Sequence, residues 1–145
     1  MLKKALLFLA ACFLVSCSSN NKPAQSPGSP AAGAISNGRM IFQTGLDSNG
    51  KQLVAQPPPL RPSCAACHGS RGAGGIRLPG GAVSADLRHR ALVLQQKHPY
   101  TLALLERAIS TGIDNQGKPL NPVMPRWTLS KRDLHDVAQY VLSQL

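Results

Sequence analysis

Residues 64–68, Cys-Ala-Ala-Cys-His, constrain the fold of this chain more than any other feature. Two cysteines three positions apart share one side of a short helical turn, and a histidine follows at once. Thiols at this spacing reach the two vinyl groups on one edge of a porphyrin, and the next residue brings an imidazole beneath the iron. The motif therefore predicts one covalently attached haem c, bound through Cys64 and Cys67, with His68 as the proximal iron ligand.

Three other interpretations of the motif remain. The first is a pair of ordinary core cysteines beside a chance histidine. The second is half of a structural zinc site, but such sites normally have four ligands, and after export no second cysteine pair is left, because Cys12 and Cys17 lie at the N-terminus. The third is a thioredoxin-like redox motif, which would need a βαβ context that this sequence lacks. Haem attachment is the favoured interpretation.

The N-terminal residues 1–20 are typical of a bacterial export signal. Lys3 and Lys4 precede an apolar stretch that is too short to span a bilayer comfortably. This stretch ends in Leu-Val-Ser-Cys at 14–17, which resembles the lipobox of bacterial lipoproteins. The resemblance implies that Cys17 receives a diacylglyceryl group and anchors the protein to a membrane. A plain secretory signal, with Cys17 incidental, is the alternative.

The predicted organisation is one small domain behind a signal and a tether. We expect a lipoprotein signal peptide over 1–16, the lipidated cysteine and a flexible tether over 17–35, and the folded domain over 36–145. The tether is rich in Ser, Asn, Pro, Gly, Ala and Gln, a composition that cannot bury a core. The expected location is the bacterial cell envelope, facing the periplasm, where c-type haem is attached in bacteria.

The folded domain is predicted to be all-α, with short helices and long loops around the haem. Capping residues, helical spacing of apolar residues and a glycine stop predict four helices, over residues 37–44, 84–95, 101–111 and 131–145. Residues 45–63 are interpreted as a surface loop; the alternatives are a cover over the haem edge or a partner contact. No internal repeat is identified, and the Gly-rich run at 72–75 is interpreted as a loop.

The region from about Asn37 to Leu145 resembles the class I cytochrome c family, as a monohaem member. In that family an N-terminal helix crosses a C-terminal helix at a close contact. The contact uses a glycine and an aromatic residue on the first helix and an aromatic residue on the second. Gly38 and Phe42 match the first pair, and Tyr140 matches the second. The glycine allows two backbones to approach because it has no Cβ.

The resemblance also implies the second axial ligand. Met124 lies in Asn-Pro-Val-Met-Pro-Arg-Trp at 121–127, in the loop where the family places its distal methionine. The flanking prolines stiffen this loop, so that a thioether is presented with little entropy left to lose. The alternative for Met124 is a gap-filling role in the core, which is the role expected of Met40. A bis-His site is the main alternative ligand set, and its candidates have polar neighbours that favour the surface: His89, His98 and His135.

Residues around the haem are assigned on the same resemblance. In the family the proximal histidine donates its free ring N–H to the carbonyl of a proline about a dozen residues later, and Pro79 lies at about that distance. Arg126 and Trp127 follow the methionine and are candidates for hydrogen bonds to the haem propionates. A turn proline and a solvated surface arginine are the alternatives for Pro79 and Arg126.

The predicted function is one-electron transfer, because an iron with both axial positions filled has no vacancy for a substrate. The protein is therefore expected to be a membrane-tethered carrier rather than an enzyme. The alternatives are a haem subunit of a larger oxidoreductase complex and a five-coordinate haem enzyme or sensor.

Charge suggests the kind of partner. The chain has 16 Lys and Arg against 6 Asp and Glu, and loss of Lys3 and Lys4 with the signal leaves 14 basic residues and a net charge of +8. A cationic redox domain attracts an acidic protein partner or an anionic membrane surface. Nucleic acid is not an expected partner, because only 4% of the residues are aromatic and the location is wrong.

Overall fold

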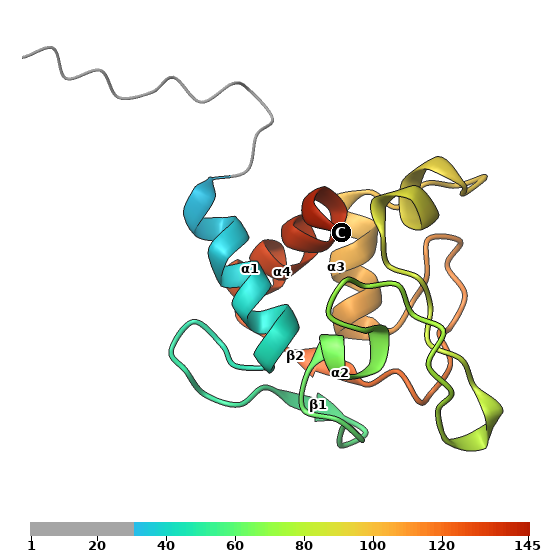
Figure 1. Ribbon diagram of the computed structural model, residues 1–145, viewed down its shortest axis with the longest axis horizontal. Helices are drawn as coiled ribbons and strands as arrows, with labels where there is room; N and C mark the ends of the chain where they lie inside the picture. The colour runs from blue at the N-terminus through green and yellow to red at the C-terminus, as the bar shows by residue number, and fades with distance from the viewer. Residues whose placement is uncertain (1–30) are drawn as a thin grey trace, which may run out of the picture.

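The computed structural model describes residues 31–145. The predicted signal peptide, Cys17 and most of the predicted tether lie outside the described residues. Figure 1 shows short helices joined by long loops, with α4 beside both α1 and α3. Within residues 31–145 no helix is both long and apolar enough to cross a membrane.

The elements follow in the order α1, β1, α2, α3, β2, α4, with a 3₁₀ turn and a π turn between α2 and α3. The helices and strands are α1 Ala32–Thr44, β1 Val54–Gln56, α2 Cys64–His68, α3 Leu102–Thr111, β2 Arg126–Thr128 and α4 Lys131–Gln144. The 3₁₀ turn is Pro79–Gly81 and the π turn is Arg90–Leu94. The fold is mainly helical, as predicted, with one small sheet in addition.

The capping residues explain where the two later helices begin. The Thr101 side chain accepts a hydrogen bond from the backbone N–H of Leu104 at the start of α3, and Ser130 accepts one from Asp133 at the start of α4. Each cap satisfies a donor that has no partner inside its helix. Gly112 ends α3 in the left-handed region, at φ 71°. The bounds predicted for these two helices are therefore confirmed to within one residue.

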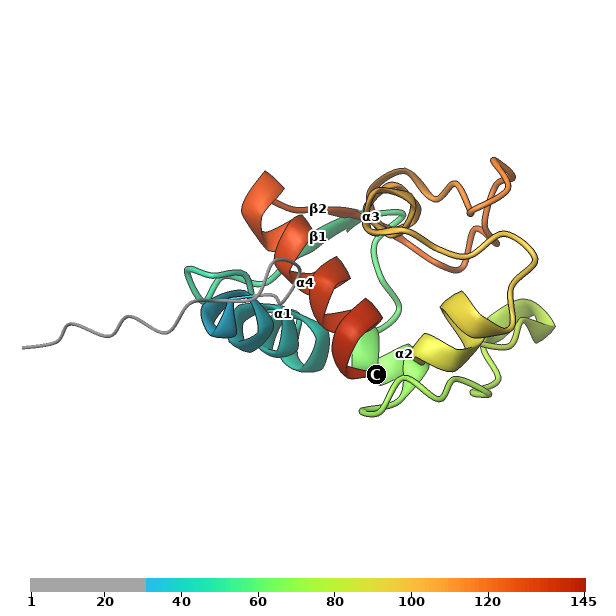
Figure 2. The same ribbon diagram turned by 90° about the horizontal axis from the view of Figure 1, so that it is seen from above.

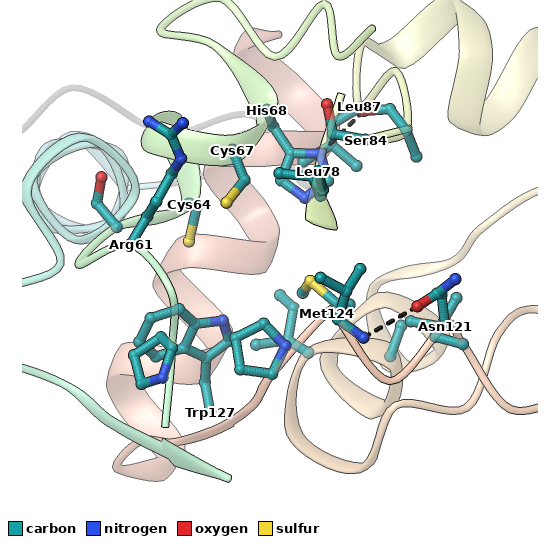
Figure 3. Close-up of a pocket in the computed structure, with 18 of the residues that line it drawn as sticks. Arg61, Cys64, Cys67, His68, Leu78, Ser84, Leu87, Asn121, Met124 and Trp127 are labelled. Atoms are coloured by element: carbon teal, nitrogen blue, oxygen red, sulfur yellow. Dashed lines mark hydrogen bonds between the residues drawn. The ribbon is translucent and has the colours of Figure 1, made fainter. Parts of the chain in front are cut away.

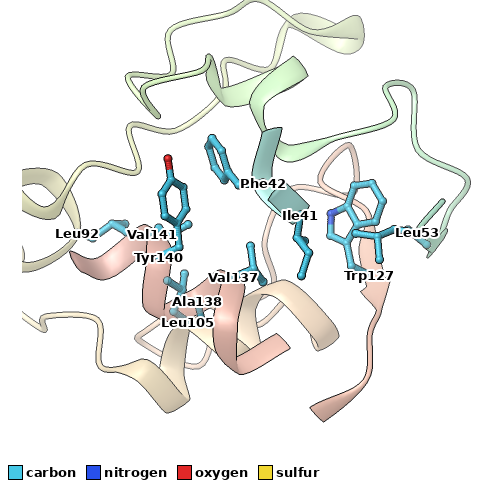
Figure 4. Packing of buried hydrophobic residues seen from close by; sticks show 11 residues of the cluster. Ile41, Phe42, Leu53, Leu92, Leu105, Trp127, Val137, Ala138, Tyr140 and Val141 are labelled. Atoms are coloured by element: carbon cyan, nitrogen blue, oxygen red, sulfur yellow. The ribbon is translucent and has the colours of Figure 1, made fainter. Parts of the chain in front are cut away.

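The close contact between α1 and α4 forms as expected. A Cβ built on Gly38 would lie 2.1 Å from the carbonyl oxygen of Asp136 and 2.7 Å from the Cβ of Tyr140, so only glycine fits there. The Phe42 and Tyr140 rings pack with centroids 5.7 Å apart at 53°. Figure 4 shows the surrounding core. Its buried side chains come from α1, α3, α4, the sheet and the segments beside them: Ile41, Phe42, Leu53, Ala55, Leu92, Leu105, Trp127, Val137, Ala138, Tyr140 and Val141.

A polar contact crosses the same pair of helices. The side-chain amide of Asn37 on α1 donates to Asp133 Oδ1 at 3.0 Å and to Asp136 Oδ2 at 2.8 Å on α4. Both carboxylates are buried. One amide thus donates to two buried acidic groups and offsets part of the hydrogen bonding that they lose on leaving water.

Two predicted helix bounds are wrong. Helix α1 begins at Ala32 instead of residue 37, inside the segment predicted as a tether. Asn37 lies inside this longer helix, whose N-cap is Ala31, and its side chain bonds to α4. The predicted helix over 84–95 is reduced to the π turn, because Ser84 and Leu87 donate their backbone N–H groups to Ile76 and Gly72 in a neighbouring loop.

Residues 45–63 do not form only a surface loop. Strand β1 pairs antiparallel with β2, with Ala55 opposite Trp127. Leu53 and Ala55 are buried, whereas Val54 and Gln56 are exposed. This alternation is typical of a half-buried strand, so the all-α expectation overlooks a signal that the sequence contains.

The structure reveals a repeat that the sequence analysis does not identify. Residues 45–53, Gly-Leu-Asp-Ser-Asn-Gly-Lys-Gln-Leu, and 112–120, Gly-Ile-Asp-Asn-Gln-Gly-Lys-Pro-Leu, form the same hairpin. The glycines that begin them have φ values of 72° and 71°, and each accepts a 2.8 Å hydrogen bond from the final leucine. Each aspartate side chain accepts from two backbone N–H groups of its own turn. Helix, hairpin and strand thus occur twice, as α1 to β1 and as α3 to β2.

Candidate functional site

The site begins at α2, which carries the Cys-Ala-Ala-Cys-His motif. The Ser63 hydroxyl caps this five-residue helix by accepting a hydrogen bond from Ala66 N–H at 3.2 Å. Gly69 ends it with a φ of 79°. Both thiols line one cavity, and His68, which is 8% exposed, lines it beside them. Figure 3 shows Cys64, Cys67 and His68 on one wall.

The remaining walls of the cavity come from distant parts of the chain. The lining residues come from α3, α4 and the loop before β2. They also come from the segments on both sides of the 3₁₀ turn and from the residues that precede the π turn. Most of these side chains are apolar, and they include Phe42, Leu78, Val83, Leu87, Leu105, Ile109, Leu120, Val123, Trp127, Val137 and Val141. An apolar cleft with two thiols on one wall fits a flat hydrophobic macrocycle attached along one edge.

His68 is fixed by a hydrogen bond to the backbone. Its Nδ1 donates to the carbonyl oxygen of Ala85 at 2.9 Å, because a carbonyl can only accept. Nδ1 therefore carries the proton, and the Nε2 lone pair remains available to a metal. Burial lowers the pKa of His68, which favours the neutral imidazole that a metal requires. The hydrogen bond to Ala85 thus fixes both the orientation of the ring and its tautomer.

The predicted role of Pro79 is wrong, since its carbonyl is not the partner of His68. A β-bridge pairs Arg77 with Val83, and the exposed 3₁₀ turn that contains Pro79 forms the tip of this hairpin. The chain then returns to the cavity, and Ala85 supplies the acceptor. The partner lies 17 positions after His68, because the hairpin adds residues between them. Nothing in the sequence distinguishes Ala85 from its neighbours.

The two cysteines are half-buried within this apolar surrounding. Burial raises the pKa of the Cys64 thiol to about 12, so that this thiol stays protonated at neutral pH. Among residues 31–145, no three His, Cys, Asp or Glu side chains converge as ligands for a metal ion. The two thiols and His68 lie side by side instead, in the lining of one cavity.

Met124 lines the cavity on the wall opposite His68 (Figure 3). Its backbone N–H donates to the carbonyl of Asn121 at 3.0 Å, and the Asn121 side chain accepts from Val123 N–H at 3.0 Å. These bonds form a tight turn between the two prolines of the loop. Met40 and the three alternative histidines are not among the residues that line the cavity, and all three histidines are exposed.

Arg126 and Trp127 differ in position. Trp127 is buried, lines the cavity and turns its indole nitrogen toward it in Figure 3, so its predicted bond to a propionate stays a prediction. Arg126 does not line the cavity. Its guanidinium donates to the backbone carbonyls of Met124 and Leu120. The predicted propionate role of Arg126 stays a prediction, with two of its five N–H groups bonded to carbonyls of the chain.

The sequence predicts few of the residues that line the cavity, and residues 59–61 among them are assigned to a surface loop. Pro59, Leu60 and Arg61 line the cavity at its edge, so the segment read as a surface loop covers part of the site. The alternation of Leu53 to Gln56 was the available signal for the strand that leads this segment there.

A comparison with protein families agrees with this geometry. The family model described as Cytochrome c matches residues 47–144, which is more than half of the chain and includes both thiols, His68 and Met124. The match includes the cavity walls from β1 onward. No curated protein matches the chain.

Proposed function

The chain belongs to the cytochrome c family, whose members bind haem c covalently, and on that premise we propose that His68 and Met124 are the two axial ligands of its haem. The observation that supports this proposal is the position of the two side chains, which face one another across a single apolar cavity (Figure 3). Cys64 and Cys67 lie on the wall that also carries His68, as covalent attachment requires. The protein is then a one-electron carrier.

The bound haem supplies an iron that changes its charge by one electron. The protein residues set how easily this happens. The His68 imidazole is held by Ala85, and the Met124 loop is closed by its own hydrogen bonds, so neither ligand has to move when the charge changes. The apolar walls exclude water, and together with thioether ligation they favour the reduced, less charged state. The arrangement suits rapid transfer at a relatively high potential.

We also propose where this carrier operates. Residues 1–17 resemble a lipoprotein signal ending at Cys17, which would tether the domain to a bacterial membrane on the periplasmic side. The excess of Lys and Arg over Asp and Glu favours a redox partner with an acidic docking face. Mass spectrometry of the mature protein from a membrane fraction tests the tether. A mature N-terminus without an acylated Cys17 would contradict it.

The ligand assignment is tested by Met124→Leu in the haem-loaded full chain. Leucine keeps the size and apolar character of the side chain but has no sulfur lone pair to donate. The wild type is expected to be low-spin, to show the weak near-red sulfur-to-iron band when oxidised, and to ignore carbon monoxide when reduced. The variant should lose that band, bind carbon monoxide and have a lower reduction potential.

Met40→Leu is the matched control, because Met40 is half-buried on α1 and lies outside the cavity. Its spectrum should equal that of the wild type. If the reduced wild type binds carbon monoxide, its iron has an open coordination position. The proposed function as an electron carrier would then be replaced by that of an enzyme or sensor.

A further inference from the structure

Arg126 is less exposed to solvent than most of the basic residues that the structure describes. It is half-buried, although most Arg and Lys side chains among residues 31–145 are exposed. Its backbone lies in β2 opposite Gln56, and the next residue, Trp127, lines the cavity. The side chain turns back toward the loop that precedes the strand.

The guanidinium joins two carbonyl groups of that loop. Nη1 donates to the carbonyl oxygen of Met124, and Nη2 donates to that of Leu120 at 3.2 Å. Leu120 closes the second hairpin and Met124 is the proposed iron ligand, so one side chain spans the segment between them. The fixed planar fork of an arginine suits two acceptors at once.

The fold leaves space for this side chain. A Cβ built on Gly112 would lie 1.8 Å from Nε of Arg126 and 2.1 Å from its Cζ. Gly112 also has a φ of 71°, in the region that favours glycine. The end of α3 is therefore shaped to receive the guanidinium.

We propose that Arg126 is a positioning residue that holds Met124 in place as the distal ligand. With Asn121 accepting from its N–H and Arg126 donating to its carbonyl, Met124 is held at both of its backbone polar groups. Removal of the guanidinium frees the carbonyl side, so the thioether leaves the iron more often. This inference rests on the His68/Met124 ligation proposed above.

The first hairpin contains a comparable contact on the other wall. The Gln52 side chain donates to the carbonyls of Gly45 at 2.9 Å and Pro62 at 2.8 Å, just before the motif begins at Cys64. There the haem is held by covalent bonds, whereas on the Met124 side it is held by coordination alone. Loss of the arginine contact therefore matters for ligand exchange, and loss of the Gln52 contact does not.

The test measures how fast Met124 leaves the iron. Imidazole is added to the oxidised, haem-loaded full chain, and the binding rate at saturating imidazole reports dissociation of the thioether. Arg126→Gln should raise this rate about tenfold and weaken the near-red band. Arg126→Lys keeps the charge but lacks the planar fork that spans two acceptors, so its rate should fall between those of wild type and Arg126→Gln.

Two controls separate position from charge and from general destabilisation. Lys118→Gln removes one positive charge from an exposed side chain of the same hairpin. Gln52→Ala removes the contact on the opposite wall. Both should exchange imidazole at the wild-type rate.

Equal rates in Arg126→Gln and Lys118→Gln would overturn the inference, because charge alone would then explain the change. A wild-type rate in Arg126→Lys and Arg126→Gln would also overturn it. The spectrum of the wild type tests the ligand assignment separately. If the oxidised wild type lacks the near-red band, the proposed His68/Met124 ligation is contradicted, and so is the role of Arg126. If the band is present, the imidazole rates test Arg126 alone.

Discussion

The loop after α2 lies against the segment whose Ala85 carbonyl orients His68. Gly74 donates its N–H to the carbonyl of His68 at 2.8 Å, and Gly75 donates to that of Ser84 at 2.9 Å. A Cβ built on Gly74 would lie 2.3 Å from the Ala85 oxygen that accepts the bond from His68. The close approach of two backbones therefore sets the position of the imidazole.

At this residue scale, Gly74→Ala should affect both stability and potential. The new methyl displaces Ala85, which costs about 1–3 kcal/mol of stability through overpacking. The weaker hydrogen bond makes His68 a poorer electron donor, so the reduction potential of the haem-loaded protein should rise. Denaturant unfolding and potentiometry measure the two effects.

Gly75→Ala is the control for Gly74→Ala. Gly75 has a similar φ, 78° against 63°, but a Cβ there meets nothing within 4 Å. It shares the backbone strain without the contact to Ala85. Equal changes in both variants would show that strain alone is responsible.

At the scale of elements, the polar contact between α1 and α4 depends on pH. Burial opposes the charge on Asp133, but hydrogen bonds from Asn37, Ser130 and Ser48 outweigh it and hold the pKa of Asp133 below its usual 3.8. Near pH 3.8 the unfolded chain therefore binds more protons than the folded one. The contribution of Asp133 to stability is full above that range and is lost as pH falls through the lowered pKa.

Asn37→Ala should reveal this dependence. At pH 7 the variant leaves two buried carboxylates without their shared donor, which lowers the free energy of unfolding by about 1–3 kcal/mol. Below about pH 3.8 the difference from wild type should shrink, because protonated Asp133 gains less from the amide. Denaturant unfolding across pH 3–7 measures it. Asn49→Ala, at an exposed turn, should change stability by less than about 0.5 kcal/mol, and a pH-independent loss in Asn37→Ala would contradict the assignment.

At the scale of the whole molecule, the positive charge should govern encounter rates. The chain has 16 Lys and Arg against 6 Asp and Glu. Screening is weak at 0.01 M salt, where the Debye length is about 30 Å, and strong at 0.15 M, where it is about 8 Å. Oxidation of the reduced protein by anionic hexacyanoferrate(III) should therefore slow severalfold between these salt concentrations. Oxidation by the cationic oxidant tris(phenanthroline)cobalt(III) should accelerate, and parallel slopes for both reagents would contradict electrostatic steering.

The sequence by itself determined the features that depend on local chemistry. The spacing of Cys64, Cys67 and His68 defines the attachment turn, and Ser130 and Thr101 set the starts of α4 and α3. The segment Asn-Pro-Val-Met-Pro-Arg-Trp likewise predicts that Met124 lies in the loop before the last helix. The interactions that form the attachment turn and the helix starts join residues only a few positions apart. The position of Met124 follows from the family motif that contains it.

Only the tertiary structure decided which groups meet across the chain. Ala85 replaces Pro79 as the partner of His68 because a hairpin intervenes, and Asn37 of α1 bonds to Asp133 and Asp136 of α4. Arg126 bonds to backbone carbonyls instead of facing the cavity. A backbone carbonyl has the same chemistry at every position, so its place in the fold determines which side chain it serves.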